Sequence, residues 1–379
     1  MKKVNFLCLI ALGIFFSACD SDDDTWGDWE KSNAFSGDYR VLATSFQYGN
    51  VAYVGMGYNS GLSTQDKFLR NFYRFDGKSW KNIGNFPAEG RKGSVSFVIG
   101  DTAFVGAGFR DKSSSADKKD HYFSDFYKLN LKTGEWIQNN GKYAKTDISI
   151  DTTGTVDTVA CRFWGGIGFS LNGKGYVGTG LVDGRVSKNI YEYDPETGKW
   201  TEMAMEGDAC VGAVVFILGG KAIVCLGSDG RSNVVDVNIF DGTEWSKQRP
   251  LQDLDGSFND DYGKIPRSYA MAFTSNLDGE KGYICGGVGT KTAWEYRLEK
   301  DRWYEVTEFP SAMMTRVAGV AFSLNGYGYV TVGGSSYTDA NDNYTWKFTP
   351  GIEEDDNNDY CPTTLLIIMW RSLNGNGQL

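Results

Sequence analysis

The sequence predicts an all-β fold made of six four-stranded units, and three observations lead to it. The chain has 379 residues with 48 Gly, 7 Pro and 15% aromatic residues, a composition typical of many strands joined by tight turns. A pattern of apolar strand, short turn and apolar strand recurs six times. A tryptophan column accompanies these hairpins, with spacings of 56, 64, 45 and 58 residues between Trp80, Trp136, Trp200, Trp245 and Trp303.

The first two strands of every unit form a hairpin. Each has Gly, Asn or Asp between two apolar runs, which is the sequence signature of a β-hairpin. In five copies the second strand is followed by a Gly eleven residues after a Phe, and the fifth copy in the chain is three residues longer. The copies are FQYGNVAYVGMG from Phe46, FVIGDTAFVGAG from Phe97, FSLNGKGYVGTG from Phe169, FILGGKAIVCLG from Phe216, FTSNLDGEKGYICGG from Phe273 and FSLNGYGYVTVG from Phe322.

A third and a fourth strand complete each unit. Third strands are expected at 72–76, 126–130, 190–194, 238–241 and 295–299, each followed by a turn and the Trp strand. Because one unit cannot bury its apolar faces alone, radial stacking of the units is expected. The glycines after strand two, the Tyr-rich third strand and the fourth-strand Trp resemble a kelch-type β-propeller over residues 29–349. The Phe and Trp columns repeat in nearly every blade and are expected to form the core.

The N-terminal segment is expected to close the ring. The sixth hairpin is followed by a third strand at 344–349, but no Trp strand comes after it. The missing strand is found at the start, where WEKSNAF (Trp29–Phe35) matches WKNIGNFP at 80–87 and WYEVTEFP at 303–310. We therefore expect six blades, with the first strand of the chain completing the last blade and leaving no open sheet edge.

The extreme N-terminus is predicted to be an export signal. Lys2 and Lys3 precede an apolar run at 4–16, which is typical of a secretory signal peptide. Residues 16–19 resemble a bacterial lipobox, which implies signal removal at 1–18 and a lipid on Cys19; a plain signal is the alternative. The acidic run at 20–24 resembles the export signal of Bacteroidetes surface lipoproteins. We expect an outer-membrane, even cell-surface, lipoprotein with an acidic tether at 19–28 and an acidic linker and unassigned tail at 350–379.

Charge and cysteine content exclude several classes of function. The net charge of −10 argues against a nucleic-acid partner, because phosphate binding needs a basic surface. The cysteines beyond the signal region have no metal-site spacing, and we expect no metal and no cofactor. A Cys161–Cys210 disulfide stays open as an alternative to free thiols. The acidic segment 253–261 could hold Ca²⁺, but a solvated loop is the simpler interpretation.

One face of the propeller carries the long insertions, at 58–70, 109–124, 137–160 and 246–266, and is the expected binding face. Four arginines stand six residues before the Phe column and are expected to converge near the channel mouth: Arg40, Arg91, Arg267 and Arg316. Blade four has Cys210 there, and blade three has Phe163 beside Arg162. Guanidinium groups bind carboxylates, so an acidic sugar or acidic peptide is the expected ligand. The alternative is that each Arg bonds its own scaffold.

Aromatic residues and loop carboxylates supply the remaining candidates. Trp164 and Tyr58 are expected to stack on a sugar ring near the arginines; the alternative is that they belong to the core, where Trp and Tyr are common in the kelch family. The kelch family includes the copper enzyme galactose oxidase, which needs two His ligands, and the single His121 excludes that site. The chain also resembles six-bladed kelch proteins that mutarotate N-acetylneuraminate, a reaction that needs a general acid/base pair. Glu89 and Asp183 lie on the expected face, without matching identified catalytic positions.

These observations favour an exported, lipid-anchored binding module for a glycan or a protein without catalytic activity. The alternative is a mutarotase acting on an acidic sugar such as N-acetylneuraminate. A third interpretation is a structural subunit of a surface assembly. The fold does not decide among them, because propellers host many functions.

Overall fold

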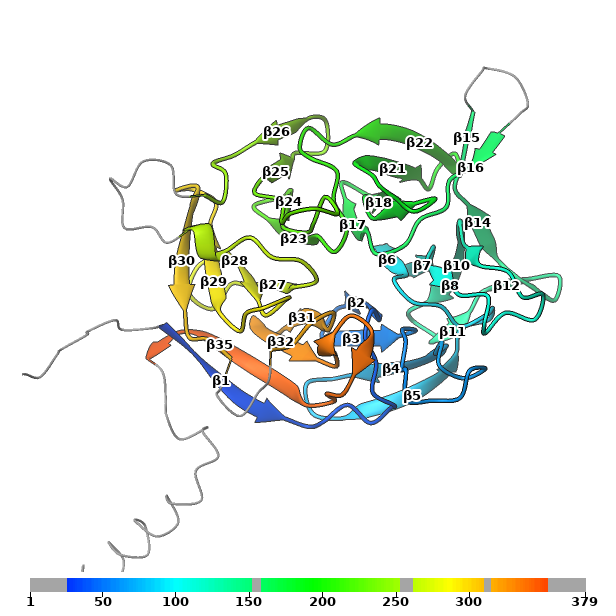
Figure 1. Cartoon of the computed structure of the whole chain (residues 1–379), viewed down its shortest axis with the longest axis horizontal. Coiled ribbons are helices and arrows are strands. Elements are labelled where there is room, and N and C mark those ends of the chain that lie inside the picture. Colours follow the sequence, from blue (N-terminus) through cyan, green and yellow to red (C-terminus); the bar gives the residue numbers. More distant parts are fainter. Residues whose placement is uncertain (1–25, 152–157, 253–261, 310–314, 354–379) are drawn as a thin grey trace, which may run out of the picture.

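The computed structural model describes residues 26–151, 158–252, 262–309 and 315–353, and these form a six-bladed β-propeller (Figure 1). Six antiparallel sheets stand around a central channel, and the first strand of each hairpin lies nearest the channel. The all-β prediction and the blade count are confirmed.

Each blade is built in chain order from the channel outwards. Blade one holds β2 (Thr44–Tyr48), β3 (Val51–Gly55), β4 (Asn71–Phe75) and β5 (Trp80–Asn85); blade two holds β6 (Val95–Ile99), β7 (Thr102–Gly106), β10 (Asp125–Asn130) and β11 (Glu135–Trp136). Blade three holds β17 (Ile167–Leu171), β18 (Lys174–Gly178), β21 (Asn189–Asp194) and β22 (Lys199–Ala204). Blade four holds β23 (Val214–Leu218), β24 (Lys221–Cys225), β25 (Val237–Phe240) and β26 (Trp245–Lys247); blade five holds β27 (Met271–Ser275), β28 (Lys281–Cys285), β29 (Ala293–Arg297) and β30 (Arg302–Val306).

Blade six joins the two ends of the propeller. It contains β31 (Val320–Leu324), β32 (Tyr327–Thr331) and β35 (Thr345–Glu353), and its outer strand is β1 (Trp26–Ser32). Trp29 pairs with Phe348 and Ser32 with Thr345, so the predicted closure is confirmed. The strand begins three residues earlier than expected and ends before Phe35. The Phe35 side chain is nevertheless only 1% exposed, because it packs against the blade-one rings of Tyr73 and Trp80, with centroids 4.7 and 4.8 Å away.

The outer strand of blade two is split by an insertion. β11 pairs with one end of β10, and β14 (Lys145–Asp147) pairs with its other end. Between them the chain forms a short hairpin, β12 (Gln138–Asn139) and β13 (Lys142–Tyr143), and a second hairpin follows, β15 (Ser149–Asp151) and β16 (Thr158–Ala160). The segment 137–160, which the sequence predicts as one long insertion, therefore contributes β14 to the outer edge of blade two before the chain returns to the channel.

Two closed rings of backbone hydrogen bonds tie neighbouring blades together. In the inner ring each N–H donates to the carbonyl of the preceding blade at 2.8–2.9 Å, through Leu42, Gly93, Gly165, Gly212, Tyr269 and Ala318. In the outer ring the Gly after each second strand donates to the following blade at 2.7–3.0 Å, through Gly57, Gly108, Gly180, Gly227, Gly287 and Gly333. All twelve residues have positive φ, a conformation that Gly adopts without steric cost. This explains the regular Phe-to-Gly interval in the sequence.

The Phe column is core, as predicted. All six residues are buried, and five stack on an aromatic ring of the second strand; the pairs are Phe46–Tyr53, Phe97–Phe104, Phe169–Tyr176, Phe273–Tyr283 and Phe322–Tyr329. In the Trp column Trp200 and Trp303 are buried, whereas the other three are half-buried against neighbouring cores. The disulfide alternative is wrong, because neither Cys161 nor Cys210 forms a disulfide bond in the structure.

Candidate functional site at the channel mouth

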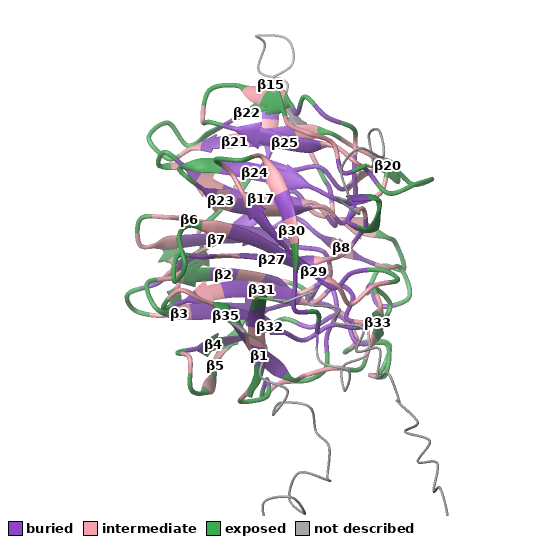
Figure 2. Cartoon of the chain, turned by 90° about the vertical axis from the view of Figure 1, so that its left-hand side faces the viewer, coloured by how far each residue is buried: buried purple, intermediate pink, exposed green. Residues whose placement is uncertain are grey.

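The two faces of the ring differ in how much chain they carry (Figure 2). One face has the hairpin turns between the first two strands of each blade. The opposite face carries small accessory hairpins: β8 (Phe109–Arg110) with β9 (His121–Tyr122), β19 (Leu181–Val182) with β20 (Arg185–Val186), and β33 (Gly334–Ser336) with β34 (Asp339–Ala340). A 3-10 turn at Tyr262–Lys264 lies within the insertion at 246–266 that follows blade four. We call this the insertion face.

The column arginines do not form a cluster open to solvent at the channel mouth. Arg40, Arg91, Arg267 and Arg316 are each 0–1% exposed. The Arg40 guanidinium donates to the carbonyl of Met56 at 3.1 Å, to that of Asn71 at 3.3 Å and to the Asn71 side chain at 2.9 Å. Arg267 makes the equivalent bonds to the carbonyls of Gly286 and Thr292 at 3.2 and 2.9 Å.

The same clamp recurs in the other two blades. Arg91 donates to the Ala107 carbonyl and pairs with Asp125, and Arg316 donates to the Tyr344 carbonyl and pairs with Asp342. Each guanidinium thus joins the end of the second strand to the start of the third, or holds the third strand alone. Burial lowers the pKa of Arg40 and of Arg267 to about 10. The expectation of convergence is wrong, and the geometry favours the scaffold alternative.

Arg162 differs from the other predicted arginines. Its side chain is exposed, and Phe163 occupies the buried position in blade three. The carbonyl of Phe163 still accepts the outer-ring hydrogen bond from Gly108 at 2.8 Å. Blade three therefore keeps the backbone hydrogen bond that the arginines accept in other blades, but it has no guanidinium to hold its second and third strands.

Three aromatic side chains surround one lysine on the insertion face. The Lys92 ammonium lies 5.0 Å from the ring centroid of Tyr58, 5.3 Å from that of Trp164 and 5.6 Å from that of Phe109. These distances are within the range of cation–π attraction. Tyr58, Lys92, Phe109 and Trp164 come from three blades, and we call them the mouth site. The predicted residues Tyr58 and Trp164 are thus brought together.

The backbone fixes the positions of these side chains. Lys92 and Phe109 exchange backbone hydrogen bonds of 3.0 and 2.9 Å, and Tyr58 and Val41 exchange the equivalent pair in blade one. Gly93, the residue after Lys92, belongs to the inner ring of hydrogen bonds. The indole of Trp164 lies against Gly93. A Cβ at Gly93 would stand 2.9 Å from that ring, so only Gly allows the indole to approach Lys92 so closely.

The electrostatics of the mouth site depend on burial of the Lys92 ammonium and on two charged groups near it, Asp111 and Lys67. Burial lowers the pKa of Lys92, the Asp111 carboxylate raises it in part, and Lys67 lowers it further. Asp111 pairs with Lys67 at 2.9 Å instead. Burial alone would raise the Asp111 pKa, but hydrogen bonds from Ser113 and Lys67 bring it to about 2. In the part of the chain that the structure describes, no carboxylate forms an ion pair with Lys92.

A second aromatic pair stands on blades five and six. Tyr269 stacks on Tyr337 with centroids 4.9 Å apart and an interplanar angle of 23°. Burial raises the pKa of Tyr269 to about 12. Tyr269, Tyr58 and Trp164 all pack against one apolar cluster formed by Val41, Leu42, Val317 and Ala318. Flat aromatic faces with one ammonium group can stack on sugar rings and pair with an anion.

Sequence reasoning missed Lys92, although a signal for it exists. Lys92 aligns with Val41, Trp164, Val211, Ser268 and Val317 in the other blades. It is the one charged residue at this position of the repeat. A cation in a column of uncharged residues beside the channel is a reason to suspect a site.

The candidate carboxylates lie outside the mouth site. Glu89 is exposed, and its carbonyl accepts a hydrogen bond from Arg91 at 3.2 Å. Asp183 is exposed at the turn between β19 and β20; burial, Asp120 and Asp183 together raise the pKa of Tyr122. Within the described ranges neither carboxylate pairs with a residue of the mouth site.

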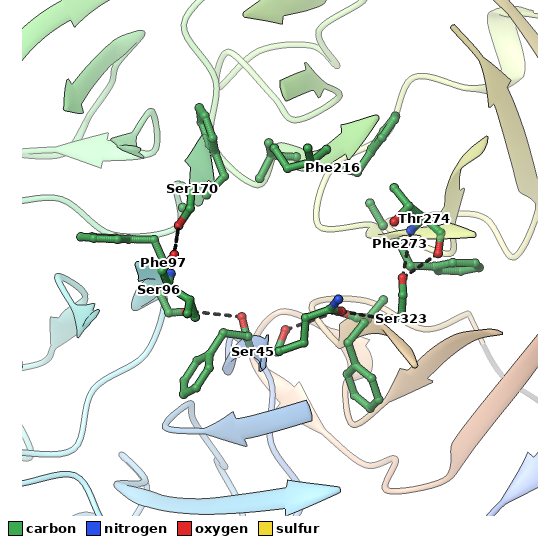
Figure 3. A pocket seen from close by; sticks show the side chains of 18 residues that line it. Ser45, Ser96, Phe97, Ser170, Phe216, Phe273, Thr274 and Ser323 are labelled. Atoms are coloured by element: carbon green, nitrogen blue, oxygen red, sulfur yellow. Dashed lines mark hydrogen bonds between the residues drawn. The ribbon is translucent and has the colours of Figure 1, made fainter. Parts of the chain in front are cut away.

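The channel also has a hollow near the turn face, with a volume of about 300 Å³ (Figure 3). Phe side chains and hydroxyl groups of the first strands line it. The hydroxyls are used between blades: Ser96 donates to the Ser45 carbonyl at 3.0 Å, and Ser323 donates to the Thr274 carbonyl at 2.6 Å. We interpret this belt as a structural contact between first strands.

Other predicted features have no test here. Cys19 and the acidic segment 253–261 lie outside the described residues. Among the residues that are described, no group of three or more His, Cys, Asp or Glu side chains is placed to hold a metal ion. The structure contains, over the same ranges, no helix with the length and apolar character needed to cross a membrane.

Comparison with known proteins supports the fold. No protein-family model and no curated protein matches the sequence. Among solved structures 651 chains match, so the architecture alone selects no activity. One of them, titled "Structure of YjhT", shares 17% identity and a TM-score of 0.60 over 83% of this chain and 95% of that one. A likeness at this identity shows the six-bladed fold alone, and the kelch repeat stays a prediction.

Proposed function

We propose that this protein is a non-catalytic binding module that holds a carboxylated glycan at the mouth site. The carrying observation is the Lys92 ammonium, which lies between the rings of Tyr58, Phe109 and Trp164 and forms no ion pair with any carboxylate of the described residues. A sugar ring stacked on these faces would bring a carboxylate to the ammonium. The hydrogen bond between them would be charge-assisted and stronger than a neutral one.

The placement of Lys92 supports a ligand role because it costs stability. A partly buried ammonium without an ion-pair partner is unfavourable, and cation–π contacts compensate only in part. The corresponding residues of the other blades carry no charge. Residues that break a local rule without a structural gain are frequent at functional sites.

Export and anchoring are proposed on the sequence alone. The signal at 1–18 and the lipobox Cys19 favour an outer-membrane lipoprotein whose propeller faces outward on the acidic tether at 19–28. Metabolic labelling with a radioactive fatty acid would check this. Label that persists after Cys19→Ser would contradict the anchor.

Replacing Lys92 with methionine is expected to weaken the binding of an acidic monosaccharide by about 10- to 100-fold. Methionine keeps the apolar volume between the rings but cannot pair with a carboxylate. Isothermal titration of the purified full-length protein with N-acetylneuraminate, glucuronate and glucose would measure the affinities. The neutral sugar should bind weakly and equally to both proteins.

Lys128→Met is the matched control, because the Lys128 ammonium also lies over two rings, Phe104 at 5.2 Å and Tyr193 at 5.9 Å, within blades two and three. It should bind acidic sugars as the unmodified protein does. Equal loss in both variants, or no heat from any acidic sugar, would contradict the proposed function.

The Lys92→Met variant should also melt at a higher temperature than the unmodified protein near neutral pH. Burial lowers the Lys92 pKa below its ordinary 10.5, so the unfolded chain binds this proton more tightly than the folded one. The charge therefore opposes folding below the folded-state pKa, and this opposition disappears as pH rises towards 10.5. Melting curves from pH 7 to 10.5 would test it; a difference that stays constant across this range would show that lost charge is not the cause.

Mutarotation remains the alternative function. It needs an acid/base group that exchanges a proton near neutral pH, whereas the Asp111 carboxyl beside the mouth site has a pKa of about 2. NMR measurement of anomer exchange in N-acetylneuraminate would decide between the two. Exchange that accelerates with protein and stops in the Lys92 variant would replace binding with catalysis.

A further inference from the structure

A second hollow opens on the insertion face beside the mouth site, between blades one and two. Its volume is about 620 Å³, within the range of ligand-binding pockets in proteins. Its lining consists of Asp38, Leu62, Gln65, Asp66, Phe68, Leu69, Arg70, Asn71, Asn85, Glu89, Gly90 and Arg110. We call it the blade groove.

The mouth site and the blade groove are joined by direct contacts between their residues. Tyr58 of the mouth site pairs with Phe68 of the groove through a β-bridge, and their rings are 5.2 Å apart. In β8, Phe109 belongs to the mouth site and the next residue, Arg110, to the groove. The Arg110 guanidinium lies 5.3 Å over the Phe68 ring. A ligand that leaves the mouth site across the loop 58–68 therefore enters the groove.

The open groups of the groove suit sugar hydroxyls and disfavour a second anion. Gln65 and Asn85 are exposed and present amides, whereas Asp38, Asp66 and Glu89 present three exposed carboxylates. The Arg110 guanidinium is committed to the carbonyls of Gly90 and Ser114 at 3.0 and 2.7 Å. Arg70 is the one exposed cation in the lining, so the groove is net negative. A carboxylate placed there would be repelled.

We infer that the ligand is an oligosaccharide with an acidic unit at the mouth site and neutral units in the blade groove. This inference rests on the proposed function, because Lys92 supplies the contact with the acidic unit. The opposite charges of the two neighbouring sites then select the order of units. An oligosaccharide whose units are all acidic satisfies the first site and is disfavoured by the second.

Affinity as a function of chain length tests this inference. Titrations of the full-length protein would compare each acidic monosaccharide with a mixed and an all-acidic oligomer. N-acetylneuraminate is compared with sialyllactose and disialic acid, and glucuronate with a hyaluronan tetrasaccharide and tetraglucuronate. In at least one series the mixed oligomer should bind about tenfold tighter than the monosaccharide, because neutral units gain hydrogen bonds from the groove amides. The all-acidic oligomer should gain nothing.

Two double variants separate the groups that act. Gln65→Ala with Asn85→Ala should abolish the length gain and leave monosaccharide affinity unchanged. Asp66→Asn with Glu89→Gln should raise the affinity for the all-acidic oligomer by several-fold, because two repulsive charges are removed. The control is Glu280→Gln with Glu299→Gln, which removes two carboxylates from a hollow on the turn face between blades four and five. It changes net charge equally and should have no effect.

The outcomes distinguish this inference from the proposed function. If the monosaccharide binds through Lys92 but the mixed oligomer gains nothing, or the gain survives the amide variant, the groove inference is wrong and the proposed function stands. An all-acidic oligomer that binds as tightly as the mixed one would also overturn the groove inference. If no saccharide binds, both are wrong.

Discussion

Replacing Arg267 with alanine is expected to lower the free energy of unfolding by about 3–5 kcal/mol. The guanidinium is 1% exposed and donates five hydrogen bonds, four to backbone carbonyls and one to the Thr292 hydroxyl. Removing it leaves buried acceptors without donors and a cavity between the second and third strands of blade five. Urea unfolding followed by tryptophan fluorescence would measure the shift in midpoint.

Two further variants give this result its meaning. Arg267→Lys keeps the charge but cannot reach the same set of acceptors with one ammonium, so it should also destabilise, though less. Arg162→Ala removes an exposed arginine beside the same column and should change stability by at most about 0.5 kcal/mol. A stable Arg267→Ala protein that has lost its affinity for acidic sugars would return the column arginines to the binding site.

Replacing Trp29 with alanine is expected to cost about 3–5 kcal/mol and to loosen blade six before the rest of the ring. The side chain is 1% exposed, with its ring centroid 4.6 Å from that of Phe309 and 4.7 Å from that of Phe348. Its indole N–H donates to the Thr307 carbonyl at 2.9 Å. Because Trp29 lies on the strand that closes the propeller, its loss exposes the edge of β35 as well.

Hydrogen exchange read by mass spectrometry would show this local opening as faster exchange in β35 at temperatures where blades two to four stay protected. Trp26→Ala is the matched control, because Trp26 lies on the same strand but is 48% exposed. It should leave both the melting temperature and the exchange pattern nearly unchanged. Uniform loss of protection in all blades after Trp29→Ala would contradict this prediction. It would mean that the propeller opens as one unit and that the β1–β35 pairing is no weaker than the contacts between the other blades.

The outer ring of hydrogen bonds explains why the Arg267 variant is expected to act beyond its own blade. The carbonyl of Arg267 accepts from Gly227 of blade four at 2.8 Å, so its backbone belongs to the outer ring. The carbonyl of Arg40 closes that ring by accepting from Gly333 of blade six at 2.8 Å. A shift in either position is transmitted to the neighbouring blade through a backbone bond.

The sequence by itself determined the number of blades, the course of each hairpin and the closing strand. These features depend on local patterns: alternation along a strand, Gly or Asn at a tight turn, and a Trp at a fixed place in the repeat. The closure of Trp29 onto Phe348 was also predictable, because a missing strand at one end matched a surplus strand at the other. The split outer strand of blade two was not, since β14 returns to β10 after an insertion with no repeat pattern.

Only the tertiary structure decided what the repeated columns of the sequence do. An arginine that recurs in four of the six blades gives the same sequence pattern whether its side chain enters the blade or the channel. Arg40 enters the blade, where the carbonyls of Met56 and Asn71 accept its hydrogen bonds. The mouth site depends even more on packing. Lys92 gains its environment from rings of three different blades, and their meeting follows from the closure of the ring rather than from any local pattern.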